Sequence, residues 1–169
     1  MKFQELYLEL ANSTGIIRTL LNGVTQKEAQ LKSNKKTWSI LEVTCHLYDE
    51  EREDFRRHLK FILDRDDDQW HVIDPQRWVT ERRYNQQDFS RMKAKFFRER
   101  RNSLAWLKTL KNADWNYKFR NKWGFISAGE MYSSWVAHDN LHIRQLVELR
   151  RTLIEKKTRP FNIAYAGEW

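Results

Sequence analysis

The sequence has little of what makes tight turns, disulfides or membrane spans. Only five glycines and two prolines occur in 169 residues, too few for a sandwich or barrel of many short strands. The single cysteine, Cys45, excludes an intrachain disulfide. No apolar run approaches the roughly 18 residues that a transmembrane helix needs, and residues 1–20 show no export signal. We therefore expect a cytoplasmic, mainly helical protein with no membrane partner.

The sequence also has few clusters of charge of one sign. The chain carries 31 Lys and Arg against 23 Asp and Glu, and the net charge of +8 would attract nucleic acid if the basic residues clustered. Basic and acidic residues instead alternate, as in residues 48–60, and only residues 93–101 and 150–159 are notably basic. We expect mixed, solvated surfaces and no nucleic-acid partner. Eight Trp and nine Phe supply a large core for one domain spanning residues 1–169.

Apolar residues repeat with the three- and four-residue spacing of a helix face in four parts of the chain. The pattern predicts helices over residues 3–24, 40–63, 89–110 and 127–156. Ser39 and Glu42 have the spacing of a capping box before the second helix, and Asp88 is a candidate cap for the third. Residues 25–36 and 64–87 are expected to be connections, the second of them a long loop. Four such helices predict an all-α four-helix bundle.

The fourth predicted helix carries two histidines on its core face. One sector of this helix contains Met131, Trp135, His138, His142, Gln145 and Leu149. Imidazoles at i and i+4 can reach one metal ion, although a hydrogen-bonded pair of core histidines fits the same spacing. A metal site needs a third donor, and the best candidate is His46, on the flank of the second helix's apolar stripe. His58, in a basic run, and His71, in the long loop, are expected to be solvated, with His71 a weaker substitute ligand.

Three segments together resemble a known family. They are WSILEVTCHLYDEE at residues 38–51, WVAHDNLHIRQL at 135–146 and PFNIAYAGEW at 160–169. The combination resembles the DinB superfamily, the damage-inducible-type bundle proteins that include the YfiT-like metal-dependent hydrolases. The resemblance implies an up-up-down-down four-helix bundle in which a histidine triad binds nickel or zinc, and the triad corresponds to His46, His138 and His142. Relatives include thiol-dependent S-transferases and a mycothiol-dependent isomerase, and bundles of this kind often form homodimers.

Three neutral imidazoles leave a divalent ion its full charge and at least one open coordination position. Such an ion activates water or binds a thiol as its thiolate, so hydrolysis and thiol transfer are both open. A hydrolase needs a general base, and the carboxylates one turn from His46 are Glu42, Asp49 and Glu50. One of them, with Glu50 a candidate, could instead accept a hydrogen bond from the free ring nitrogen of His46. Gln145 is expected to bond to a metal ligand or, preferably, to a backbone carbonyl.

Other residues have expected places in the core or around the site. Glu51 and Arg100 interrupt apolar stripes, so we expect them to form a buried ion pair. Cys45 is interpreted as a packing residue rather than a catalytic thiol. Candidates for the wall of a pocket above the metal are Trp38, Trp78, Trp135 and Trp169, with Trp135 placed best on its helix.

The leading hypothesis is a metal-dependent thiol S-transferase or hydrolase that acts on a small-molecule substrate. Its cofactors would be one divalent ion, nickel or zinc, and for the transferase a low-molecular-weight thiol. The main alternative is a non-catalytic, metal-binding stress-response bundle protein. A further alternative is a bundle whose triad is present but binds no metal.

Overall fold

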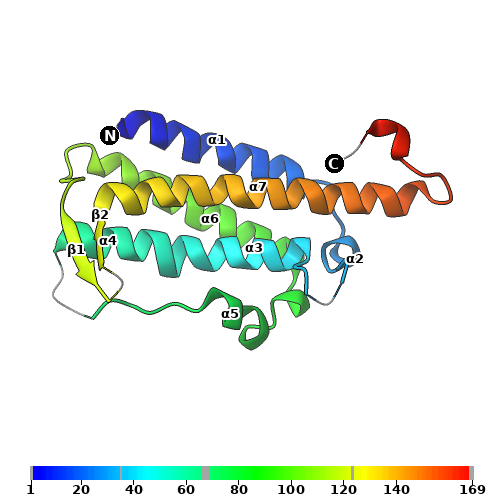
Figure 1. The fold of residues 1–169 in the computed structure, drawn as a ribbon, viewed down its shortest axis with the longest axis horizontal. Coiled ribbons are helices and arrows are strands. Elements are labelled where there is room, and N and C mark those ends of the chain that lie inside the picture. The colour runs from blue at the N-terminus through cyan, green and yellow to red at the C-terminus, as the bar shows by residue number, and fades with distance from the viewer. Residues whose placement is uncertain (1, 35, 66–68, 123, 168–169) are drawn as a thin grey trace.

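The computed structural model describes residues 2–34, 36–65, 69–122 and 124–167. Its bundle consists of four helical segments, α1 (Phe3–Leu21), α3–η1–α4 (Ile40–Asp49, Glu50–Phe55 and Arg56–Asp64), α6 (Phe89–Leu107) and α7 (Ala128–Thr158). In Figure 1, α1 lies beside α7 and runs in the same direction, whereas α3 and α6 run the opposite way. This confirms the predicted all-α bundle with two neighbouring helices up and two down. Within the described ranges, no helix has both the length and the apolar composition to cross a bilayer.

Shorter elements join the bundle helices. They are α2 (Gln26–Ala29), α5 (Pro75–Glu81), the 3-10 turns η2 (Tyr84–Gln86), η3 (Lys108–Leu110) and η4 (Ala164–Ala166), and the strands β1 (Lys118–Asn121) and β2 (Gly124–Ser127). The strands form an antiparallel hairpin in which Lys118 is opposite Ser127. The expectation that residues 25–36 and 64–87 lack helices was wrong, because α2 and α5 lie there.

Side-chain caps fix where the helices of the site begin. Ser39 Oγ accepts a hydrogen bond from the Glu42 backbone N–H, and the Glu42 carboxylate accepts one from the Ser39 N–H. Ser127 and Glu130 form the same capping box at the start of α7. Asp88 caps α6 through the Arg91 N–H, so the predicted starts of the second and third bundle helices are confirmed.

The second bundle helix changes its winding next to the site. Residues Glu50–Phe55 form a π-helix, a rare arrangement that places an extra residue in the turn and occurs often at functional sites. Glu50 and Glu51 are both buried there, with 4% and 1% of their surface exposed. The sequence predicted one uninterrupted α-helix, so this π-helix is a correction to that prediction.

Two apolar clusters fill the bundle, and a buried arginine meets both of them. Arg100 lies against the ring of Phe96 in one cluster and donates to the backbone carbonyl of Leu10 in the other. Its Nε donates to Glu51 Oε2 at 2.9 Å, which confirms the predicted ion pair. Asp139, which the sequence reading did not include, binds the same guanidinium through both carboxylate oxygens. The polar network therefore connects the helices that carry the candidate ligands.

Candidate metal centre

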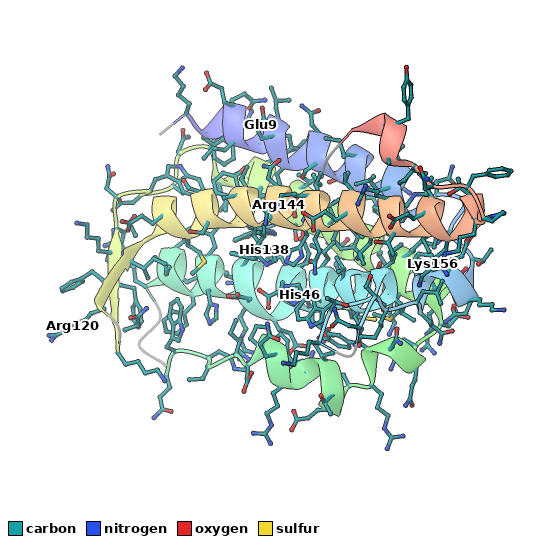
Figure 2. All side chains as sticks on the ribbon, turned by 45° about the vertical axis from the view of Figure 1, so that its right-hand side comes forward. Glu9, His46, Arg120, His138, Arg144 and Lys156 are labelled. Carbon is teal, nitrogen blue, oxygen red and sulfur yellow. The ribbon has the colours of Figure 1, made fainter. Side chains whose placement is uncertain are left out.

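His46 from α3 meets His138 and His142 from α7. Figure 2 labels His46 and His138 on these two helices. The Nε2 atom of His138 lies 3.3 Å from His46 Nε2 and 3.1 Å from His142 Nε2. One ligand atom from each of the three residues lies within 4.8 Å of the others. His46 and His142 are buried, and His138 is partly buried. The i and i+4 spacing on α7 thus brings two rings onto one point, and the antiparallel α3 supplies the third.

The protonation state of the triad suits a cation. Burial, together with the neighbouring His142 and His138, lowers the pKa of His46 to about 2. Burial also lowers the pKa of His138 to about 4 and lowers that of His142. His142 Nδ1 donates to Gln145 Oε1 at 2.8 Å, which leaves the lone pair of its neutral ring on Nε2. At neutral pH the three rings are therefore uncharged, with nitrogen lone pairs available at their meeting point.

The spacing of the nitrogens agrees with metal ligation. Two imidazole nitrogens bound tetrahedrally to one zinc ion at about 2.0–2.1 Å are about 3.3 Å apart. Two of the three separations, 3.3 and 3.1 Å, are close to this value, and the third is at most 4.8 Å. The partner of His142 is also of the expected kind, because a metal-ligating histidine usually donates its other N–H to a fixed acceptor. The donor set fits zinc or nickel, both of which accept imidazole.

Glu50 is the carboxylate that faces the triad. Its Oε1 lies 3.8 Å from His46 Nδ1, and both atoms are buried without a hydrogen-bond partner among the described residues. Burial, with the nearby Asp54 and Asp49, raises the pKa of Glu50 to about 9. The other two carboxylates near His46 have different partners, since Glu42 caps α3 and binds Lys32, while Asp49 accepts from Tyr84. Of the three candidates, Glu50 is the one that lines the cavity at the triad.

Asp54 and His58 extend this polar wall, and the sequence reading missed both. Asp54 lines the cavity and lies 2.6 Å from His58 Nδ1, whose Nε2 lies 2.7 Å from the backbone oxygen of His71. The His58 ring stacks on Trp70 with 4.0 Å between ring centroids. The expectation that His58 is solvated was wrong, because only 2% of it is exposed. The spacing of His46, Glu50, Asp54 and His58 at every fourth residue could have indicated this polar stripe.

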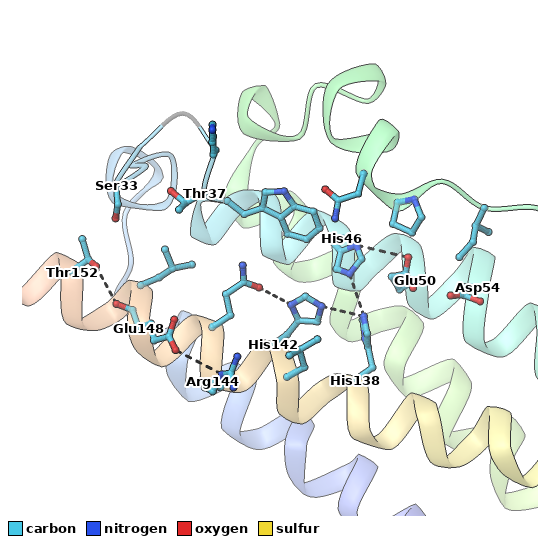
Figure 3. Close-up of a pocket in the computed structure, with 18 residues that line it drawn as sticks. Ser33, Thr37, His46, Glu50, Asp54, His138, His142, Arg144, Glu148 and Thr152 are labelled. Carbon is cyan, nitrogen blue, oxygen red and sulfur yellow. Dashed lines mark hydrogen bonds and ion pairs between the residues drawn. The ribbon is translucent and has the colours of Figure 1, made fainter. Parts of the chain in front are cut away.

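A cavity of about 800 Å³ opens over the triad (Figure 3). Its walls come from α7, from α3 and η1, from Ser33 and residues 36–38 before α3, and from Ile73, Pro75 and Gln76 around the start of α5. Trp38 lines it as predicted, with its ring 4.8 Å from His46 and 6.3 Å from His142, measured between centroids. A volume of this size is typical of small-molecule sites.

The other tryptophans lie elsewhere. Trp78 is buried under the guanidinium of Arg82, 4.1 Å from its ring, and does not line the cavity. Trp135 is also absent from the cavity wall, because its ring stacks on Phe55 and its indole N–H donates to Glu51 in the core. Trp169 lies outside the described residues. Trp135, one turn before His138 on α7, therefore points into the bundle rather than toward the cavity opening.

Two predictions about nearby polar residues have different outcomes. Gln145 bonds to the ligand ring of His142, so the preferred expectation of a backbone carbonyl was wrong. Cys45 is fully buried in the core, and burial raises the pKa of its thiol to about 12. Its position agrees with a packing role.

Comparison with known protein families matches residues 9–146 to the model described as the DinB superfamily. The chain belongs to the DinB superfamily. All three histidines lie inside the matched segment. Its fold is also similar to a solved structure described as "YfiT from Bacillus subtilis is a probable metal-dependent hydrolase with an unusual four-helix bundle topology". That match has a TM-score of 0.77 at 18% identity and covers 90% of this DinB chain and 87% of the other. A search of curated protein sequences gave no match.

Proposed function

We propose that His46, His138 and His142 hold one divalent ion, zinc or nickel, and that this DinB protein is a metal-dependent hydrolase of a small molecule. The observation that carries the proposal is the convergence of three neutral imidazoles, with Nε2 separations of 3.3 and 3.1 Å, at the base of an open cavity. The fold similarity to YfiT, which is described as a probable metal-dependent hydrolase, supports the same reaction class.

Each residue of the site has a distinct task in this proposal. Three histidines fill one side of a tetrahedral or larger coordination sphere, and Gln145 keeps His142 in the tautomer that ligates through Nε2. A bound divalent ion supplies Lewis acidity and lowers the pKa of water to about 7. Glu50 accepts or donates a proton at Oε1, the atom that faces the triad without another partner among the described residues. Trp38 restricts access of bulk water from the α2–α3 side of the cavity.

Thiol transfer is the second reaction that the same centre allows. A transferase would need a low-molecular-weight thiol from solution, because Cys45 is fully buried and does not line the cavity. A volume of about 800 Å³ has room for a thiol as well as a small electrophile. The two reactions share the metal ligands and differ in the nucleophile.

Metal analysis of untagged protein is the first test. We expect about one equivalent of zinc or nickel per chain, and loss of the metal in His142→Ala. Turnover is then screened with generic esters and amides and, separately, with small thiols plus electrophiles. Hydrolysis that depends on the metal, and that falls at least tenfold in Glu50→Gln with metal content unchanged, supports the proposed role of the carboxylate.

The controls separate the alternatives. Glu99→Gln changes a carboxylate on α6 that lies outside the cavity and should leave turnover unchanged. Full metal occupancy with no turnover of either substrate class would favour the non-catalytic metal-binding protein. Less than about half an equivalent of metal, or equal activity in His142→Ala, would contradict the proposed centre.

A further inference from the structure

The cavity extends well beyond the triad along α7. Residues of α7 that line it run from His138 to Thr152. His142 and Thr152 differ by ten positions, which on an α-helix corresponds to about 15 Å. The opposite wall runs the other way along the sequence, from Glu50 and His46 back to residues 36–38 and Ser33, because α3 and α7 are antiparallel. The cavity is thus a groove with the triad toward one end and the α2–α3 connection at the other.

The groove changes character along its length. Carboxyl groups of Glu50 and Asp54 lie at the end with the triad, as Figure 3 shows. Trp38 and Leu141 supply apolar walls beside the histidines, and Leu149 supplies one further along α7. Leu141 is 52% exposed, so its side chain is accessible to a ligand in the groove. The middle of the groove therefore matches an aliphatic or other apolar segment.

The far end is polar and holds a cation. Ser33, Lys36 and Thr37 come from the connection before α3, and Thr152 faces them from α7. The Lys36 backbone N–H donates to the Asn34 side chain. Among the residues that the structure describes, no carboxylate forms an ion pair with Lys36.

The other charges near this end compensate each other. Arg144 and Glu148 also border the groove, and they face each other at 3.7 Å as an i, i+4 pair. Of the charged side chains that line the distal end in the described part of the chain, Lys36 is therefore the one without a partner, and it is complementary to an anion. The proximal end, in contrast, presents neutral imidazoles and acidic groups.

We propose that the groove binds an elongated substrate with its reacting group at the triad, an apolar segment against Trp38, Leu141 and Leu149, and an anionic group at Lys36. The assignment of the reacting end rests on the proposed function. The apolar and anionic subsites rest on the groove itself. A carboxylate and a phosphate are both suitable as the terminal group, since each accepts charge-assisted hydrogen bonds from an ammonium group.

Monohydroxamates of linear dicarboxylic acids test this assignment, because a hydroxamate binds divalent metals and the free carboxylate mimics the anionic end. A series from succinic through suberic to dodecanedioic monohydroxamate is titrated by calorimetry into zinc-loaded and zinc-free protein. Alkanohydroxamates of the same lengths, which lack the terminal carboxylate, form the neutral series, and alkyl phosphates form a third arm. We expect affinity to rise about fourfold per methylene until the chain reaches Lys36, and then to level off.

A charge reversal tests the distal subsite. In Lys36→Glu, the advantage of the carboxylate series over the neutral series, about fivefold, should disappear. Lys27→Glu makes the same change on α2, outside the cavity, and should keep the advantage. Both lysines are exposed, so both variants should fold, which far-UV circular dichroism checks. A stronger effect with the phosphate arm would identify phosphate as the preferred terminal group.

The outcomes separate this inference from the proposed function. Length dependence and the Lys36 effect in zinc-free as well as zinc-loaded protein support the elongated groove. If zinc gives the hydroxamates no gain while both effects persist, the metal site is refuted and the groove assignment still stands. Affinity that is independent of chain length and unchanged in Lys36→Glu would overturn the inference.

Discussion

Arg100, on α6, connects the four helical segments of the bundle. Its guanidinium is 1% exposed and bonds to Glu51 on η1 through Nε at 2.9 Å. Nη1 and Nη2 bond to Asp139 on α7 at 2.5 and 2.8 Å, and Nη1 also donates to the Leu10 carbonyl on α1 at 3.3 Å. Asp139 directly follows His138, so this network lies next to a candidate metal ligand.

Arg100→Met is therefore expected to lower the free energy of unfolding by about 3–5 kcal/mol, as for other buried charge networks that lose one partner. The substitution removes the guanidinium that Glu51 and Asp139 both face, and it leaves two buried carboxylates without that cation. Solvent screens little of this penalty, because both carboxylates are 1% exposed. Urea unfolding followed by circular dichroism, with linear extrapolation, measures the change. A loss below about 1 kcal/mol would refute the reasoning.

Two further variants test the cause of this loss. Arg98→Met, on an exposed part of α6, should change stability by less than about 0.5 kcal/mol. Adding Glu51→Gln and Asp139→Asn to Arg100→Met should recover part of the lost stability, because the uncompensated charges are then gone. Zinc affinity should fall in Arg100→Met if the network positions His138. Unchanged zinc affinity would show that the network stabilises the bundle without setting the ligand geometry.

Three further predictions follow from the site and its surroundings. Gln145→Leu should weaken zinc binding about 10- to 100-fold in a competition titration, whereas Gln69→Leu on the surface should not. Metal-free protein should lose stability as pH falls below about 6.5, because a histidine in the unfolded chain takes up a proton near pH 6.5 whereas folded His138 does so only near 4. His138 alone would lower the free energy of unfolding by about 2 kcal/mol by about pH 5. Unfolding midpoints that stay unchanged over this pH range would contradict the prediction. Cys45 should react with iodoacetamide only after unfolding, and rapid labelling of native protein would contradict its burial.

Local signals made most of the fold predictable from sequence. The capping box of Ser39 and Glu42 and the cap at Asp88 act within one turn, so the helix starts could be predicted without tertiary information. Similar local signals precede the two short helices that the sequence analysis did not predict. A capping box at Thr25 begins α2, and Pro75 follows the cap Asp74 at the start of α5. The hairpin strands have four residues each, too short to show a period.

The site was predictable where one helix determines the geometry. The spacing of His138 and His142 predicts that their rings meet, and helical periodicity placed His46 near the core. The cavity wall was less predictable, because it depends on which segment covers the opening. Trp38, from the connection before α3, reaches the triad, whereas Trp135, on the ligand helix itself, packs into the core. His58 is buried through contacts with Trp70 and the following backbone, which helical periodicity does not describe.

Three successive carboxylates, Asp49, Glu50 and Glu51, lie where α3 passes into the π-helix, beside the candidate metal centre. Asp49 is neutralised by Arg82 at 2.7 Å, and Glu51 by Arg100 at 2.8 Å. Glu50 is equally buried but has no cationic partner among the described residues, and burial with neighbouring acids raises its pKa to about 9. At neutral pH the metal-free protein therefore holds Glu50 in its neutral, protonated form, and a positive charge beside it would favour the ionised form. The neutral triad next to Glu50 offers a divalent ion its ligands, so the bound ion would supply the charge that Arg82 and Arg100 supply to the neighbouring carboxylates.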